Sequence, residues 1–146
     1  DSAGQESYRA ITRSYYRNTA CALVVYDVTA RASFEAAERW SEEARAAGGS
    51  GLRLALVGNK RDAPGRQVSE DEGAALATRT GMRFYETSAR EDEEAAGIFA
   101  TLAEDVLAAV LAGELDPYSE GSGVRAAVTR PGGEGTPAQL EARRCC

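Results

Sequence analysis

The sequence predicts an α/β fold with a doubly wound, mainly parallel sheet, on two observations. Short apolar runs alternate along the chain with longer amphipathic stretches. Such alternation gives right-handed βαβ crossovers, which place neighbouring strands parallel. The composition agrees, because 43% hydrophobic and 27% charged residues in a chain of 146 are typical of one domain plus a tail. Ligands of such sheets bind beyond the carboxyl ends of the strands, so the polar segments after the apolar runs are candidate site residues.

Three apolar runs are the predicted strands, at residues 21–26, 52–57 and 82–85. The first is continuously apolar and contains branched side chains, a pattern typical of a strand covered on both faces. Arg53 in the second run indicates that one end of that strand reaches solvent. A polar segment follows each of the last two runs directly.

Three amphipathic stretches are the predicted helices. The first begins at Ser33, which is suited to an N-cap, and its inward stripe comprises Phe34, Ala37, Trp40 and Ala44. The second runs over 69–80, with a capping box between its first residue and Glu72, and Gly81 ends it. The third covers 91–111, and its inward face comprises Ala95, Ile98, Phe99, Leu102, Val106 and Val110.

Composition divides the chain into a folded part, 1–112, and a flexible tail, 113–146, that is rich in Gly, Pro, Ser and Arg. The net charge of −6 argues against a nucleic-acid surface, which requires a basic face. No apolar run is long enough to cross a bilayer, and no secretory signal is present. Cys21 is expected to be a small buried side chain, and the remaining cysteines, Cys145 and Cys146, end the chain, so neither a disulfide framework nor a metal site is predicted.

The segment Asn59-Lys60-Arg61-Asp62 directly follows the second strand. The Asp62 carboxylate can accept two parallel hydrogen bonds from the N1–H and exocyclic NH2 of guanine, a pair that adenine does not offer. Asn59 would brace the neighbouring loops, and Lys60 would lay its apolar stem along the base. Taken alone, the tetrapeptide equally suits a polar turn after a strand.

The segment Glu86-Thr87-Ser88-Ala89 directly follows the third strand. The backbone N–H of Ala89 could donate to the guanine O6, and Ser88 could hold the Asp62 loop. An ordinary helix start with Thr87 or Ser88 as its cap is the alternative for this segment taken alone. Because both segments follow adjacent strands of one sheet, they would face one ligand, and their combination favours a guanine site.

The first residues, Asp1 to Glu6, offer a third pattern. Asp1 could hold Mg²⁺ through water, Gly4 could bring its N–H to a terminal phosphate, and Gln5 could orient the water that attacks it. A disordered terminus is the alternative.

In this order and spacing the three segments resemble the Ras-like small GTPases, with details of the Rab branch near its thirty-nine and forty-two members. Those details are Ile11 to Arg17, Leu23 to Thr29, Phe34, Trp40, and Ser2 with Asn18. The resemblance implies a P-loop NTPase-type fold, here without its N-terminal strands, that uses GTP/GDP and Mg²⁺. Gln5 would be catalytic, and Asp1 would lie near the metal. The residues implied to contact nucleotide are Asp1, Gly4, Asn59, Lys60, Asp62, Ser88, Ala89 and Arg90.

The resemblance also implies a GTP-regulated switch in vesicle trafficking, with effectors, an exchange factor, a GTPase-activating protein, an escort protein and a geranylgeranyl transferase as partners. Cys145 and Cys146 would carry two prenyl groups, because two lipids anchor a protein stably where one does not. The expected location is the cytoplasmic face of vesicle, Golgi, endosome or phagosome membranes, in exchange with cytosol.

The phosphate-binding pattern G-x-x-x-x-G-K-[ST] is absent from the sequence, in which Lys60 is the only lysine. We therefore expect this chain alone to bind nucleotide weakly and to hydrolyse it negligibly, because the phosphates lack their main partners. A non-catalytic, prenylated short isoform or fragment that acts only through protein and membrane interactions is the alternative reading.

Overall fold

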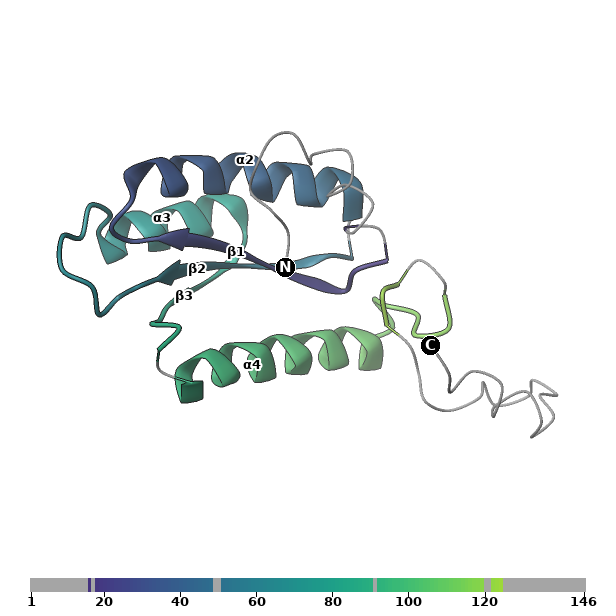
Figure 1. Ribbon diagram of the computed structural model, residues 1–146. Helices are drawn as coiled ribbons and strands as arrows, with labels where there is room; N and C mark the ends of the chain where they lie inside the picture. The colour runs from purple at the N-terminus through teal and green to yellow at the C-terminus, as the bar shows by residue number, and fades with distance from the viewer. Residues whose placement is uncertain (1–15, 17, 49–50, 91, 120–121, 125–146) are drawn as a thin grey trace, which may run out of the picture.

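The computed structural model describes residues 16, 18–48, 51–90, 92–119 and 122–124, and shows strands alternating with helices (Figure 1). The elements in order are β1 (Cys21–Asp27), α2 (Arg31–Gly48), β2 (Arg53–Asn59), α3 (Glu70–Thr80), β3 (Arg83–Glu86) and α4 (Asp92–Leu111). All lie within two residues of the predicted boundaries, which confirms the alternation that the sequence indicates.

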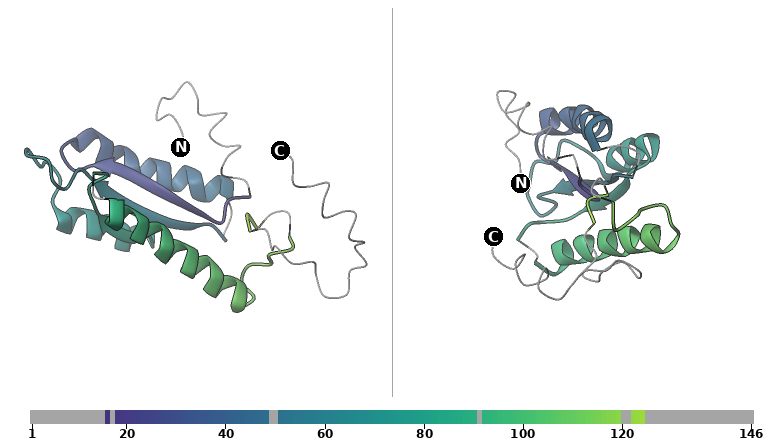
Figure 2. Two further views of the ribbon diagram at one scale, coloured as in Figure 1. Left: turned by 60° about the horizontal axis from the view of Figure 1, so that its bottom comes forward. Right: turned by 90° about the vertical axis from the view of Figure 1, so that its right-hand side faces the viewer.

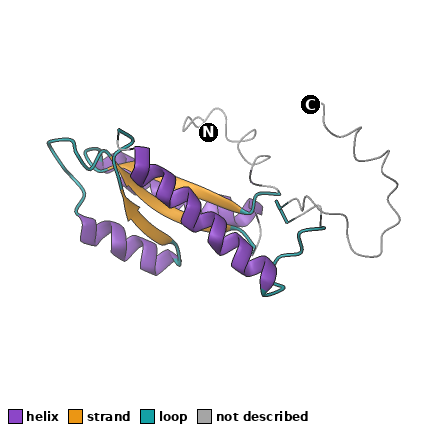
Figure 3. Ribbon diagram, turned by 90° about the horizontal axis from the view of Figure 1, so that it is seen from below, coloured by secondary structure: helices purple, strands orange, loops and turns teal. Residues whose placement is uncertain are grey.

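The three strands form a parallel sheet in the order β1-β2-β3. Helices α2 and α3 cover one face of this sheet and α4 covers the other (Figures 1 and 2). Seen from the α4 side, that helix runs along the length of the strands (Figure 3). The result is the predicted α/β class, because each strand returns parallel to the last through a helix on one face.

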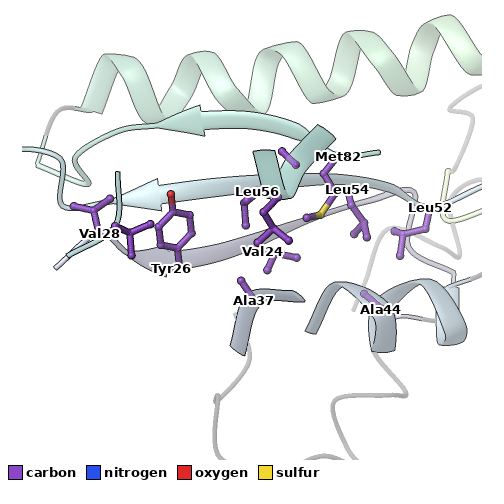
Figure 4. Close-up of a cluster of buried hydrophobic side chains, with 12 residues drawn as sticks. Val24, Tyr26, Val28, Ala37, Ala44, Leu52, Leu54, Leu56 and Met82 are labelled. Atoms are coloured by element: carbon purple, nitrogen blue, oxygen red, sulfur yellow. The ribbon is translucent and has the colours of Figure 1, made fainter. Parts of the chain in front are cut away.

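The larger core lies between the sheet and helices α2 and α3 (Figure 4). Ala37 and Ala44 of α2 are buried in it, and Phe34 and Trp40 pack partly buried at its side, as the predicted stripe requires. A smaller cluster under α4 contains Ala55, Val57, Ile98 and Leu102. Successive β2 side chains therefore alternate between the two clusters, which is why this strand is apolar throughout.

The ends of the helices test two expectations. The capping box of Ser69 and Glu72 is present, and Gly81 ends α3 in the left-handed region at φ 64°. Ser33, however, is not an N-cap, because α2 already begins at Arg31. Its hydroxyl instead accepts from the Asp27 N–H at 3.0 Å and donates to the Ala30 carbonyl at 2.7 Å. Ser33 thus ties the start of α2 to the end of β1.

Two apolar residues are more exposed than the sequence predicts. Val25 in β1 is 54% exposed, so this strand is not covered on both faces by the described residues. Phe99 in α4 is 61% exposed, because the helix packs Ile98 and Leu102 against β2 and Phe99 lies beside that stripe. No helix in the described ranges combines the length and apolar character needed to span a bilayer.

The described structure continues past residue 112, where the sequence places the end of the folded part. Leu115 and Ser122 are buried, and Glu114 forms an ion pair with Arg53 at the start of β2. Gly123, at φ 70°, lies against the backbone of residues 18–20, where a Cβ would come within 2.4 Å of a backbone nitrogen. These residues therefore add contacts at the end of the sheet where the strands begin.

Candidate functional site

The polar loops that follow the three strands meet at one end of the sheet, on the left in Figure 1. The strand register brings them level, because Asp27 pairs with Asn59 and Gly58 pairs with Glu86. This is the carboxyl edge of the parallel sheet, where the sequence predicts a ligand.

The loops after β2 and β3 are joined directly through Asn59. Its side-chain oxygen accepts hydrogen bonds from the N–H of Lys60 at 2.7 Å and from the N–H of Ala89 at 3.0 Å. Backbone bonds reinforce this link, since the Arg61 N–H donates to the Thr87 carbonyl at 3.2 Å. Asn59 therefore holds the two loops together, as the sequence predicts. In this structure it accepts the hydrogen bond of the Ala89 N–H, the group that was predicted to donate to guanine O6.

Asp62 and Ser88, one from each loop, lie side chain to side chain. Ser88 is buried, and its hydroxyl accepts from the Arg90 N–H at 3.3 Å. A hydrogen bond from Ser88 lowers the pKa of the Asp62 carboxyl, and the positive charge of Arg90, 3.5 Å away, lowers it further. The carboxylate is consequently ionised at neutral pH and can only accept hydrogen bonds.

Lys60 is directed toward the end of β1. It has a positive φ of 65°, and its ammonium lies 2.5 Å from the Asp27 carboxylate. Asp27 also accepts from the Thr29 N–H at 2.8 Å and from the Thr29 hydroxyl at 2.6 Å. The Lys60 bond, followed by the Thr29 bond, lowers the pKa of Asp27 to about 2. Lys60 thus ties the loop after β2 to the loop after β1.

Arg66 holds the rest of the loop after β2. Its guanidinium forms a fork with the Glu86 carboxylate at 2.8 and 2.9 Å, and it also donates to the Val68 carbonyl. The Glu86 side chain is only 6% exposed, so this pair is shielded on the carboxylate side. Planar two-point pairing of this kind fixes orientation as well as distance, so the loop position is set by the end of β3.

Sequence reasoning missed Asp27, Thr29 and Arg66. A polar residue directly after an apolar run was the available signal for Asp27, because polar segments after the later runs supplied the other candidates. Arg66 gave no such signal, because its partner Glu86 lies 20 residues away.

The Asp62 carboxylate and the Arg90 guanidinium are charged groups at this end of the sheet. The ionised Asp62 side chain is 34% exposed, and the Arg90 side chain beside it is 88% exposed, so both are accessible to a ligand. Asp1, Gly4 and Gln5 lie outside the described residues, as do Cys145 and Cys146. Within the described ranges no group of three or more His, Cys, Asp or Glu side chains is placed to hold a metal ion.

A model of the Ras family matches residues 1–108, which is 108 of the 146 residues. The matched range contains all three loops described above.

Proposed function

Because this chain belongs to the Ras family, we propose that its three loops form the guanine-binding end of a Rab-type small GTPase. Complete members of the family use GTP or GDP with Mg²⁺. The proposed protein is a GTP-regulated switch in vesicle trafficking that binds and hydrolyses GTP when complete.

The observation that carries the proposal is the joining of the two loops. Asn59 of one loop contacts Ala89 of the other at 3.0 Å, and Asp62 of the first bonds to the buried Ser88 of the second. The hydrogen-bonding groups that guanine requires, an anionic acceptor pair and a backbone donor, therefore come from two loops that are hydrogen-bonded to each other. Preorganised groups bind more tightly, because less ordering is needed when the ligand arrives.

Each residue has a distinct part in this proposal. Asp62 accepts from the N1–H and NH2 of the base, and Ser88 keeps its carboxylate ionised and oriented. The Ala89 N–H donates to guanine O6, and its hydrogen bond to Asn59 is then either shared with the base or broken. The aliphatic stems of Lys60 and Arg90 cover the faces of the ring. A bound nucleotide supplies the phosphoanhydride bond that hydrolysis breaks.

Nucleosides test the base preference without involving the phosphates. Guanosine, inosine and adenosine are titrated into the 146-residue chain, and the backbone amide resonances of Asp62 and Ala89 are followed by NMR. Guanosine should bind tightest, and inosine, which lacks the exocyclic NH2, should bind about tenfold more weakly. Adenosine should leave these resonances in place.

Asp62→Asn should remove the preference for guanosine, because an amide offers one acceptor and two donors where two acceptors are needed. Asp71→Asn, an exposed position in the first turn of α3, is the matched control and should bind as the parent does. Equal binding of guanosine and adenosine by the parent chain would refute the proposal.

The Rab-level assignment rests on sequence features that the Ras-family match does not distinguish. Its support is the segment LVVYDVT at residues 23–29, the packing of Phe34 and Trp40 on the core, and the Cys145-Cys146 pair. We propose that both cysteines are geranylgeranylated and anchor the protein on the cytoplasmic face of trafficking membranes. Mass spectrometry after reaction with escort protein and transferase should show two added prenyl groups on the parent chain. Each single Cys→Ser variant should carry one prenyl group, and the double variant should carry none.

A further inference from the structure

At the opposite end of the sheet, where the strands begin, a cavity of about 260 Å³ lies between the helix layers. The register explains it. Strand β3 joins the sheet only at Arg83, opposite Ala55, so the first residues of β2, Arg53 and Leu54, have no β3 neighbour beside them. The space left is bounded by Arg45 of α2, Gly81 after α3 and Asp105 of α4.

Positive charge is concentrated around this cavity. Its lining contains three arginines, Arg45, Arg53 and Arg83, but one carboxylate, Asp105, in a chain whose net charge is −6. The buried side chains of Leu52, Leu54 and Leu102 complete the wall. Counting Glu114, which is paired with Arg53, the three guanidiniums exceed the two carboxylates beside them by one positive charge.

Two of the guanidinium groups have more hydrogen-bond donors than their bonds to other described residues use. Arg45 donates to the Thr80 carbonyl at the end of α3, and Arg53 donates to the Glu114 carboxylate, each through one nitrogen. Arg83 pairs with Asp105. A guanidinium has five N–H donors, and the bonds to other described residues use one nitrogen each of Arg45 and Arg53. The volume is several times the ~30 Å³ that one water occupies, enough for a four-oxygen anion.

We propose that this cavity binds a phosphate-class oxyanion, held by Arg45, Arg53 and Arg83, which displaces the Glu114 carboxylate from Arg53. Arginine suits this chemistry, because its planar fork matches two phosphate oxygens at once. Glu114 lies shortly after the end of α4 at Leu111 and pairs with one of the guanidiniums from within the chain. It acts as a built-in competitor, 61% exposed and therefore free to leave. The same chemistry serves a free phosphate or the headgroup of a phosphorylated lipid.

Calorimetric titration of the 146-residue chain with inorganic phosphate tests the site, with chloride at matched ionic strength as the reference. Arg53→Gln and Arg83→Gln should each weaken binding about tenfold, because each removes a charge-assisted contact. Arg79→Gln removes an arginine that pairs with Glu38 on the outer surface and should stay within about twofold of the parent. Arg53→Lys keeps the charge and should fall between the parent and Arg53→Gln.

Glu114→Gln separates an anion site from a set of structural ion pairs. It should tighten phosphate binding about threefold, because it frees Arg53 from its competitor. If the arginines only stabilise the fold, Glu114→Gln lowers the melting temperature and leaves phosphate affinity unchanged, and the proposal fails. It also fails if phosphate gives no more heat than chloride, or if Arg79→Gln loses as much affinity as Arg53→Gln.

Vesicles distinguish the two sources of phosphate. The chain is sedimented with phosphatidylcholine vesicles with and without a phosphatidylinositol phosphate. Binding that requires the phosphorylated lipid, is competed by inorganic phosphate and is lost in Arg53→Gln identifies a lipid headgroup as the ligand. Phosphate binding in solution without vesicle binding identifies a soluble phosphate compound.

Discussion

The side-chain oxygen of Asn59, at the end of β2, accepts a hydrogen bond from the backbone N–H of Ala89, 30 residues further along the chain, at 3.0 Å. Together with the bond from the Arg61 N–H to the Thr87 carbonyl, this contact sets the distance between the loops after β2 and β3. It comes from a strand end that is itself held in the sheet, so the loop after β3 takes its position from the rigid part of the domain.

Replacing Asn59 should loosen the second loop. In Asn59→Ala we expect the Ala89 amide to exchange with solvent about tenfold faster, and the free energy of unfolding to fall by about 1 kcal/mol, because an acceptor is lost. Hydrogen exchange followed by NMR measures both. Asn59→Asp keeps an acceptor oxygen at the same place and is the control, so it should preserve Ala89 protection. Equal exchange in Asn59→Ala and the parent would show that the contact is not formed.

The Asp27–Lys60 pair should make the free energy of unfolding depend on pH in the acid range. The folded pKa of Asp27 is about 2, below its ordinary value of 3.8, so the folded state binds fewer protons between these values. Its contribution is present above pH 3.8 and is lost as pH falls toward 2. Urea unfolding across this range should therefore show that the free energy of unfolding falls less with acid in Asp27→Asn than in the parent. In the surface variant Asp71→Asn it should fall as much as in the parent. If the free energy of unfolding has the same dependence on pH in all three proteins, the pairing of Asp27 with Lys60 is contradicted.

Removing the Tyr26 hydroxyl should stabilise the protein. Tyr26 is 1% exposed, and within the described residues its hydroxyl has no hydrogen-bond partner. Burial, with the Glu86 charge adding to it, raises its pKa to about 12, so the group stays neutral but unsatisfied. Tyr26→Phe keeps the ring, which packs edge-on against Phe34 with centroids 5.0 Å apart. We expect about 1 kcal/mol of added stability in urea unfolding.

Tyr85→Phe is the matched comparison, because the Tyr85 side chain bonds to Arg83. That substitution should leave stability unchanged or slightly lower. A loss of stability in Tyr26→Phe would mean that its hydroxyl is hydrogen-bonded in solution, to water or to another part of the chain.

The edge of β1 should promote self-association. Among the described residues β1 is an edge strand, and Val25 is 54% exposed on it. Unpaired edges with apolar side chains pair readily with other chains, and a lysine there opposes pairing. Sedimentation velocity should show concentration-dependent association of the parent chain and less of it in Val25→Lys. Ala75→Lys adds the same charge at an exposed α3 position and should associate like the parent.

Much of the fold follows from local pattern. The alternation of runs, the stripe of α2 and the capping box of α3 were readable because each depends on residues within a few positions of one another. The parallel orientation of the strands followed as well, because a helix between two strands returns the chain to the same end of the sheet. The exposure of Phe99 was not readable, since its position on the apolar stripe does not say which part of that stripe meets the sheet.

In the candidate site, too, some features could be read from the sequence and others could not. The positions of the polar segments 59–62 and 86–89 after two predicted strands could be read from the sequence, because order and spacing are properties of the chain alone. The pairs Lys60–Asp27 and Arg66–Glu86, and the three arginines around one cavity, become visible only in the folded chain. These pairings depend on strand register and loop path, through which residues far apart in sequence approach within hydrogen-bond distance.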